Sequence, residues 1–149
     1  MLSNVSIIED ELLNPANLKQ NLLSLGLKKV ELDSTEYLLA EGYALKYKQL
    51  SIYDRIALAI AKNRNITLLT GDGRLRAAAK KECVTVIGTL AILDRLYAYG
   101  HISEEEYDEC LNEIKKYNGD EIRLPSVEVE QRLSAEFKLY IKGALNLKA

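Results

Sequence analysis

The stretch Leu50–Asp72 constrains the fold more than any other part of this chain, because it places an apolar helix directly before a short buried strand. Asp54 falls in the first turn of the helix expected over 52–62, and Asp72 follows the strand expected over 66–70. Helix–strand units of this kind build parallel sheets, whose ligands collect at the carboxyl ends of the strands. We therefore expect an α/β fold with both acids near one edge of a parallel sheet.

Strand and helix patterns alternate on both sides of this stretch. Short strands are expected over 5–8, 29–32 and 84–87. Helices are expected to open at Asn14-Pro15, at Asp33-x-x-Glu36 and at Ser103-x-x-Glu106, since an N-cap followed by proline or by an acid at the third position is a common helix start. These patterns predict a three-layer α/β/α domain with a short parallel sheet over residues 1–125.

The remainder, residues 126–149, is expected to form a helical C-terminal extension. It reads as one helix from Ser126, along which apolar residues recur every fourth position: Leu133, Phe137, Ile141 and Leu145. Such a stripe needs a cover, and either the domain body or a second copy of the chain can supply it.

Composition excludes several classes of function. The chain has 149 residues, a net charge of −2 and one histidine, His101, which rules out a mechanism that needs two histidines. A slightly acidic chain is not expected to bind nucleic acid non-specifically. A local basic groove is still compatible with this charge, because six basic residues surround the two acids in sequence: Lys62, Arg64, Arg74, Arg76, Lys80 and Lys81. Cys83 and Cys110 are expected as buried thiols in a reducing cytoplasm, and no apolar run is long enough to cross a membrane.

Each of the two acids has a structural interpretation beside the functional one. Ser51-x-x-Asp54 is itself a capping box, and an aspartate between Gly71 and Gly73 is a common turn residue or helix cap. Together, however, Asp54 and Asp72 supply the hard carboxylate oxygens that Mg²⁺ and Mn²⁺ prefer. A phosphate-binding turn at Gly71–Gly73 is a weaker third interpretation, because the turn lacks the lysine and spacing of such loops.

Several separated blocks resemble the second half of a PIN domain in order and spacing, from about Leu50 to Pro125. They are Ser51–Asp54, Leu68–Asp72, Val84–Thr89, Gly100–Ser103 and Arg123–Pro125. The resemblance implies a Mg²⁺- or Mn²⁺-dependent nuclease of the kind found as the ribonuclease toxin of a toxin–antitoxin pair. It implies an RNA substrate, an antitoxin protein and a homodimer. It also implies that Asp54 and Asp72 bind the metal, with Ser51 and Thr70 ordering them.

The front of the chain departs from this pattern. A PIN domain opens with a strand that ends in an aspartate, and a glutamate follows on a helix. In one register Val5–Ile8 is that strand and Asp10 its aspartate. In the other, which fits the spacing better, Val5–Ile8 is the second strand and neutral Asn14 falls at the position of the glutamate. The first register favours a ribonuclease in which Asp10 assists Asp54 and Asp72. The second favours a degenerate PIN-like protein that binds nucleic acid or a partner without cleaving.

Overall fold

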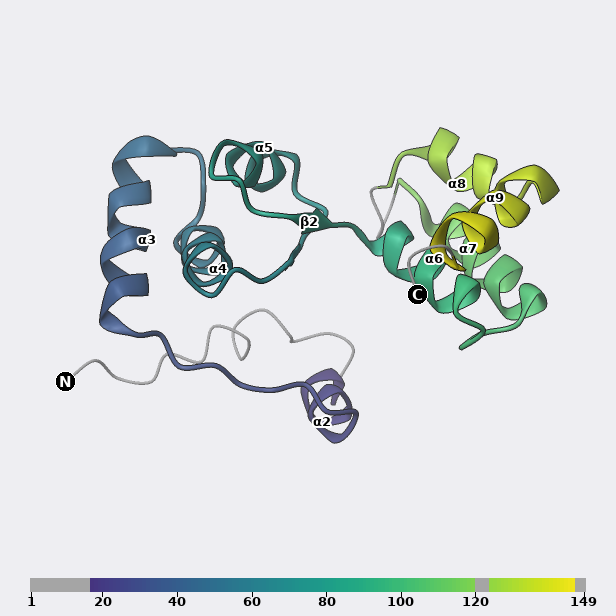
Figure 1. Ribbon diagram of the computed structural model, residues 1–149, viewed down its shortest axis with the longest axis horizontal. Coiled ribbons are helices and arrows are strands. Elements are labelled where there is room, and N and C mark those ends of the chain that lie inside the picture. Colours follow the sequence, from purple (N-terminus) through teal and green to yellow (C-terminus); the bar gives the residue numbers. More distant parts are fainter. Residues whose placement is uncertain (1–16, 120–123, 147–149) are drawn as a thin grey trace. The chain divides into compact units, whose positions relative to one another are not determined.

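A computed structural model describes residues 17–119 and 124–146, which form two compact units (Figure 1). The first unit takes in the described residues up to Ile66 together with Ala77–Val84, and the second takes in Thr67–Arg76 and the described residues from Thr85 onward. Within these residues, no helix is both long and apolar enough to cross a bilayer.

The first unit is helical and is built on two long helices. It contains α2 (Leu18–Ser24), α3 (Ser34–Lys46), α4 (Ile52–Asn63) and most of α5 (Gly73–Lys81). Helix α2 ends before Gly26, whose φ of 98° lies in the left-handed region that glycine tolerates. The expected helix start at Asn14-Pro15 lies outside the described residues, as does the strand expected over 5–8.

Helices α3 and α4 pack against each other in the core of this unit. Ala40 and Tyr43 of α3 are buried, as are Leu58 and Ala59 of α4. Alanines on α5 complete the core at Ala78 and Ala79. Alanine side chains let helix backbones approach closely, so the packing of α3 against α4 fixes the direction of α4 and therefore of its first turn.

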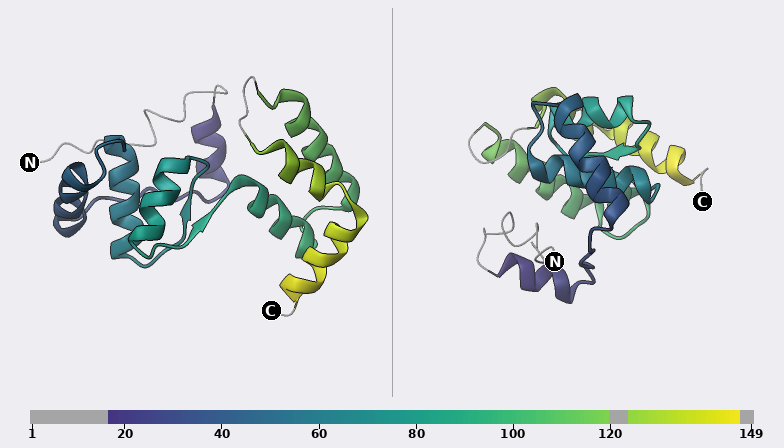
Figure 2. Two further views of the ribbon diagram at one scale, coloured as in Figure 1. Left: turned by 90° about the horizontal axis from the view of Figure 1, so that it is seen from above. Right: turned by 90° about the vertical axis from the view of Figure 1, so that its left-hand side faces the viewer.

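The second unit carries a two-stranded parallel sheet. Strand β1 (Leu68–Leu69) pairs with β2 (Val86–Ile87), with Leu68 opposite Val86 (Figure 2). Backbone hydrogen bonds from Leu68 N to Thr85 O (2.9 Å) and from Thr70 N to Ile87 O (3.1 Å) close the ladder. The connection between the two strands passes through α5, which is the helical crossover that a parallel pair requires. The expected parallel α/β arrangement is therefore present, with shorter strands than predicted.

The strand predicted over 29–32 does not form. Residues 27–33 are extended but have no regular structure, and no strand among the described residues pairs with them. Val30, at the centre of the predicted strand, remains 54% exposed and so is not buried in a core.

Four helices make the rest of the second unit: α6 (Thr89–Ala98), α7 (Glu104–Tyr117), α8 (Ser126–Arg132) and α9 (Ala135–Asn146). They surround one apolar cluster, whose buried members are Leu90, Tyr97, Tyr107, Leu111, Val129 and Ile141. Tyr97 and Tyr107 stack in this cluster with ring centroids 4.7 Å apart.

The C-terminal extension is two helices, and the prediction of one continuous helix from Ser126 is wrong. Ser134 interrupts it: its hydroxyl donates to Gln131 O (2.8 Å) and accepts from Phe137 N (3.3 Å), so it ends α8 and caps α9. Leu133, Phe137 and Ile141 pack into the apolar cluster, so the chain itself covers this part of the predicted stripe. The side chain of Leu145 lies outside the described part.

Candidate metal-binding acids

Asp54 is held in the first turn of α4 by a complete capping box. Its backbone N–H donates to Ser51 Oγ (3.1 Å), and its Oδ2 accepts from Ser51 N (3.2 Å) and Ser51 Oγ (2.8 Å). All of these bonds involve one carboxylate oxygen or the backbone. Within residues 17–119 and 124–146, Oδ1 of Asp54 has no hydrogen-bond partner, so this oxygen stays available to a ligand.

Asp72 lies at the carboxyl end of β1 and caps the start of α5. Its Oδ1 accepts from Leu75 N (2.8 Å), and its own N–H donates to Thr70 Oγ1 (3.0 Å). The residue is exposed, and its Oδ2 has no hydrogen-bond partner in the part of the chain that the structure describes. Asp72 therefore combines a structural role with one free carboxylate oxygen, as Asp54 does.

The sequence placed Ser51 and Thr70 beside these acids, and each makes a direct contact there. Ser51 bonds the carboxylate of Asp54, whereas Thr70 bonds the backbone of Asp72. Gly71 and Gly73 have no positive φ, and a Cβ at either position would meet no atom within 4 Å. The turn is thus not a tight glycine cradle, and the structure adds nothing to the phosphate-binding interpretation of it.

The donor chemistry of the two acids fits a hard divalent cation. Mg²⁺ is usually held by one or two carboxylates, with waters and substrate phosphates completing the shell. Asp54 belongs to the first unit and Asp72 to the second. Among the described residues, no three His, Cys, Asp or Glu side chains gather into a possible metal site. Asp10, the predicted third acid, lies outside those residues, and so does Asn14.

Comparison with known families decides which kind of domain carries these acids. The PIN-domain profile matches residues 10–135, which is most of the chain. The chain belongs to the PIN-domain family. No match was found among curated proteins or among solved structures. The family predicted from the sequence is confirmed, and with it a nuclease-like α/β fold of the kind that typically uses divalent metal ions.

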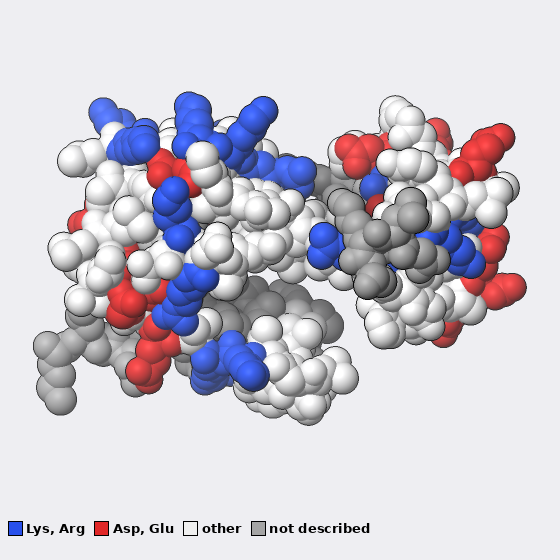
Figure 3. All heavy atoms as spheres, viewed as in Figure 1, with Lys and Arg blue, Asp and Glu red and all other residues white. Residues whose placement is uncertain are grey.

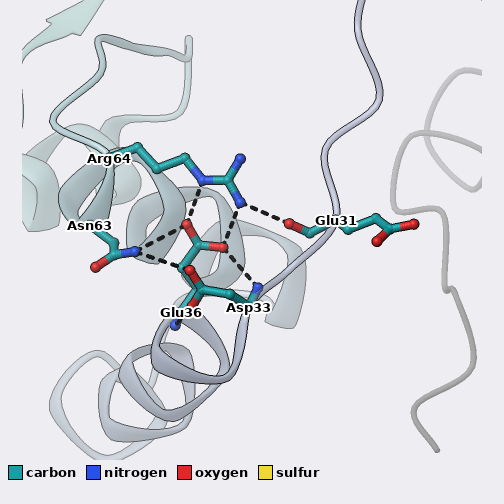
Figure 4. A network of polar contacts seen from close by, with 5 residues as sticks. All are labelled: Glu31, Asp33, Glu36, Asn63 and Arg64. Atoms are coloured by element: carbon teal, nitrogen blue, oxygen red, sulfur yellow. Dashed lines mark hydrogen bonds and ion pairs between the residues drawn. The ribbon is translucent and has the colours of Figure 1, made fainter.

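The sequence did not indicate the buried ion pair that links α3 to the C-terminal end of α4 in this PIN domain. Glu36 of α3 is fully buried and accepts from Arg64 at both oxygens, with Nε–Oε1 at 2.6 Å and Nη2–Oε2 at 2.8 Å (Figure 4). Asn63 Nδ2 (3.3 Å) and Asp33 N (3.0 Å) also donate to this carboxylate. These donors, Arg64 foremost, lower the pKa of Glu36 to about 2, so it stays ionised.

Because of this ion pair, Arg64 does not belong to the expected basic groove. Arg64 was expected to be available to a nucleic-acid backbone, but its guanidinium also donates to Glu31 O (2.8 Å) and is committed to holding α3, α4 and the preceding segment together. The box Asp33-x-x-Glu36 indicated where Glu36 would lie. No local pattern indicated its partner, because Arg64 is 28 residues away in sequence.

A second buried network lies in the helical part of the PIN domain. Asp94 of α6 accepts from Arg132 of α8, with Nε–Oδ1 and Nη2–Oδ2 both at 2.9 Å, and from the hydroxyl of Tyr107 (2.7 Å). Burial and the neighbouring Asp94 carboxylate raise the pKa of Tyr107 above its usual value, so its hydroxyl remains a donor. The network joins α6, α7 and α8, and its residues serve packing.

The cysteines correct a further expectation. Cys83 and Cys110 are both free and exposed, whereas buried thiols were expected. Cys83 has φ 58° and ends the turn after α5, whereas the next residue, Val84, is buried.

Proposed function

We propose that this PIN domain is a metal-dependent ribonuclease in which Asp54 and Asp72 bind Mg²⁺ or Mn²⁺. The observation that carries the proposal is that both acids, although they cap helices, keep one carboxylate oxygen free of hydrogen bonds to the described residues. Membership of a nuclease-like family supports the reaction class. An antitoxin partner and a homodimer, both expected from the family resemblance, belong to the same proposal.

Hydrogen bonds within the chain hold the two carboxylates in fixed orientations. Ser51 fixes the rotation of the Asp54 side chain by bonding Oδ2, and the N–H of Leu75 does the same for Asp72 through Oδ1. Fixed carboxylates lose little freedom when they bind a cation, which raises their affinity for it. A bound Mg²⁺ or Mn²⁺ would supply activation of water and stabilisation of phosphoryl oxygens. Asp10 is proposed as the third acid.

Cleavage of a fluorogenic RNA in the presence of Mn²⁺ tests this function. We expect Asp54→Asn and Asp72→Asn each to lower the rate roughly a hundredfold or more, because an amide cannot replace a carboxylate at a hard cation. Asp10→Asn should cause a similar loss if Asp10 completes the site.

The chain offers a matched control for Asp54→Asn. Glu106 occupies the same capping-box position in α7, accepting from Ser103 N at 2.7 Å and donating from its own N–H to Ser103 Oγ. Glu106→Gln should disturb its helix as Asp54→Asn disturbs α4 but leave cleavage unchanged. Equal loss of cleavage in the two variants would contradict the metal-binding role of Asp54.

A second candidate function is binding of nucleic acid or a protein partner without cleavage. Two observations favour it: both acids already cap helix starts, and the described residues contain no cluster of three candidate metal ligands. Binding of RNA by wild-type protein that shows no Mn²⁺-dependent cleavage would favour this candidate over the first.

A further inference from the structure

Two lysines from different helices of the first unit converge on Glu82. Lys46 Nζ lies 2.5 Å from Glu82 Oε1, and Lys62 Nζ donates to the backbone oxygen of Glu82 (2.5 Å). Figure 3 shows the corresponding basic area along the C-terminal end of α3 and along α5. We call this area the lysine surface, and its members come from the ends of three helices and an adjoining loop: Lys46, Lys48, Lys62, Lys80 and Lys81.

The one acid in this area is already neutralised. Glu82 accepts from Lys46 and from the hydroxyl of Tyr47 (2.6 Å). Burial alone would raise the pKa of Glu82, but these hydrogen bonds outweigh it and hold the pKa below its usual value. Lys48, Lys80 and Lys81 are exposed, and their ammonium groups have no ion pair or hydrogen bond with any residue that the structure describes. The lysine surface therefore carries an uncompensated positive charge.

Neither composition nor helix stability explains this charge. The chain as a whole has a net charge of −2, so a cluster of unpaired lysines is not a consequence of general basicity. Cations do favour helix C-termini. That effect accounts for cations in the last turns of the helices, but Lys48 lies outside the helices.

The residue type indicates what binds here. Lysine is depleted in protein–protein interfaces, which favour aromatic residues, methionine and arginine. Exposed lysines are instead typical contacts for the phosphates of a nucleic-acid backbone, which they neutralise without reading its sequence. We propose that the lysine surface binds the phosphate backbone of single-stranded RNA, an inference that rests on the proposed ribonuclease function.

This surface is separate from the acid that α4 presents. Asp54 lies in the first turn of α4 and Lys62 in its last, eight residues later. At 1.5 Å per residue, the two lie roughly 12 Å apart along the helix axis. The lysine surface thus holds the RNA strand away from the carboxylate of Asp54, at the opposite end of the same helix.

Binding of a fluorescein-labelled oligouridylate to the full chain in EDTA tests the proposal, because EDTA removes any contribution from metal or cleavage. The triple variant Lys48→Gln, Lys80→Gln, Lys81→Gln removes only unpaired charges and leaves the contacts of Glu82 intact. We expect it to bind at least about tenfold more weakly at low salt, and its plot of log affinity against log salt should be shallower by about 2.

Lys115→Gln, Lys116→Gln on α7 is the control, because both lysines are exposed and pair with acids, Glu130 and Glu113. It should bind RNA as wild type does, and all variants should match wild type in melting temperature. Equal weakening in the control, or tighter binding of poly-glutamate than of RNA, would overturn the proposal. So would the absence of RNA binding in EDTA, even if Mn²⁺-dependent cleavage is present. Intact lysine-dependent binding without cleavage would leave this inference standing and remove the ribonuclease function.

Discussion

At the scale of single residues, the packing of the first unit depends on the buried carboxylate of Glu36. It is fully buried and ionised, and it is satisfied by Arg64, Asn63 and the backbone of Asp33. Charges in such positions contribute little net stability while paired but cost much when one partner is removed. The packing of α3 against α4, and with it the position of Asp54, therefore depends on Arg64.

Arg64→Ala should lower the free energy of unfolding by roughly 3–5 kcal/mol, because it leaves the Glu36 carboxylate buried without its bidentate partner. Urea unfolding followed by circular dichroism measures this loss. Lys28→Ala, an exposed change in the same unit, serves as the control and should change the free energy of unfolding by less than about 0.5 kcal/mol. A loss that small for Arg64→Ala would show that the pair is not formed.

The lowered pKa of Glu36 predicts that the free energy of unfolding depends on pH. The pKa of Glu36 is about 2 in the folded protein against an ordinary value of 4.5, so between these values the unfolded chain binds more protons than the folded one. Its contribution to stability is therefore complete above about pH 4.5 and is lost as pH falls towards 2. The difference in unfolding free energy between wild type and Glu36→Gln should shrink over this window. A difference independent of pH would contradict the assignment.

At the scale of elements, the helix starts were the most predictable part of the chain. Three capping boxes, at Asp33, Ser51 and Ser103, appear where the sequence predicts them, because a cap is a contact between residues three apart. Predictions failed where a partner far along the chain was needed. The segment over 29–32 has strand-forming residues but no neighbouring strand among the described residues. Ser134 interrupts a helix that the periodicity alone would continue.

The capping box of α4 gives a prediction that separates stability from metal binding. Ser51→Ala should cost about 1 kcal/mol of stability, since it removes the cap of the Asp54 N–H. It should also weaken Mn²⁺ binding about tenfold, because one of the two bonds that orient the Asp54 carboxylate is lost. Thermal unfolding and calorimetry measure the two effects.

Ser103→Ala is the matched change in α7, where the same box has no proposed metal ligand. It should cost a similar amount of stability and leave Mn²⁺ binding unchanged. Weaker Mn²⁺ binding in Ser103→Ala would mean that the effect of Ser51→Ala comes from stability and not from orientation.

At the scale of the whole molecule, the sequence predicted the family, the parallel pairing of the two strands and the helical C-terminal part. It placed Asp54 and Asp72 at a helix start and a strand end, where the structure has them. It could not indicate the pairs Glu36–Arg64 and Asp94–Arg132, which join residues 28 and 38 positions apart and have no local signature. The division at residue 125, the homodimer and the antitoxin stay predictions.

The proposed ribonuclease function depends on the binding of a divalent metal by Asp54 and Asp72 of this PIN domain. Calorimetric titration of Mn²⁺ into wild type, Asp54→Asn, Asp72→Asn and the Glu106→Gln control tests it directly. We predict binding by wild type and Glu106→Gln that is lost in both aspartate variants, because each removes one of two carboxylate ligands. Absence of binding in wild type, or undiminished binding in Asp54→Asn and Asp72→Asn, would contradict the claim and leave both acids as helix caps.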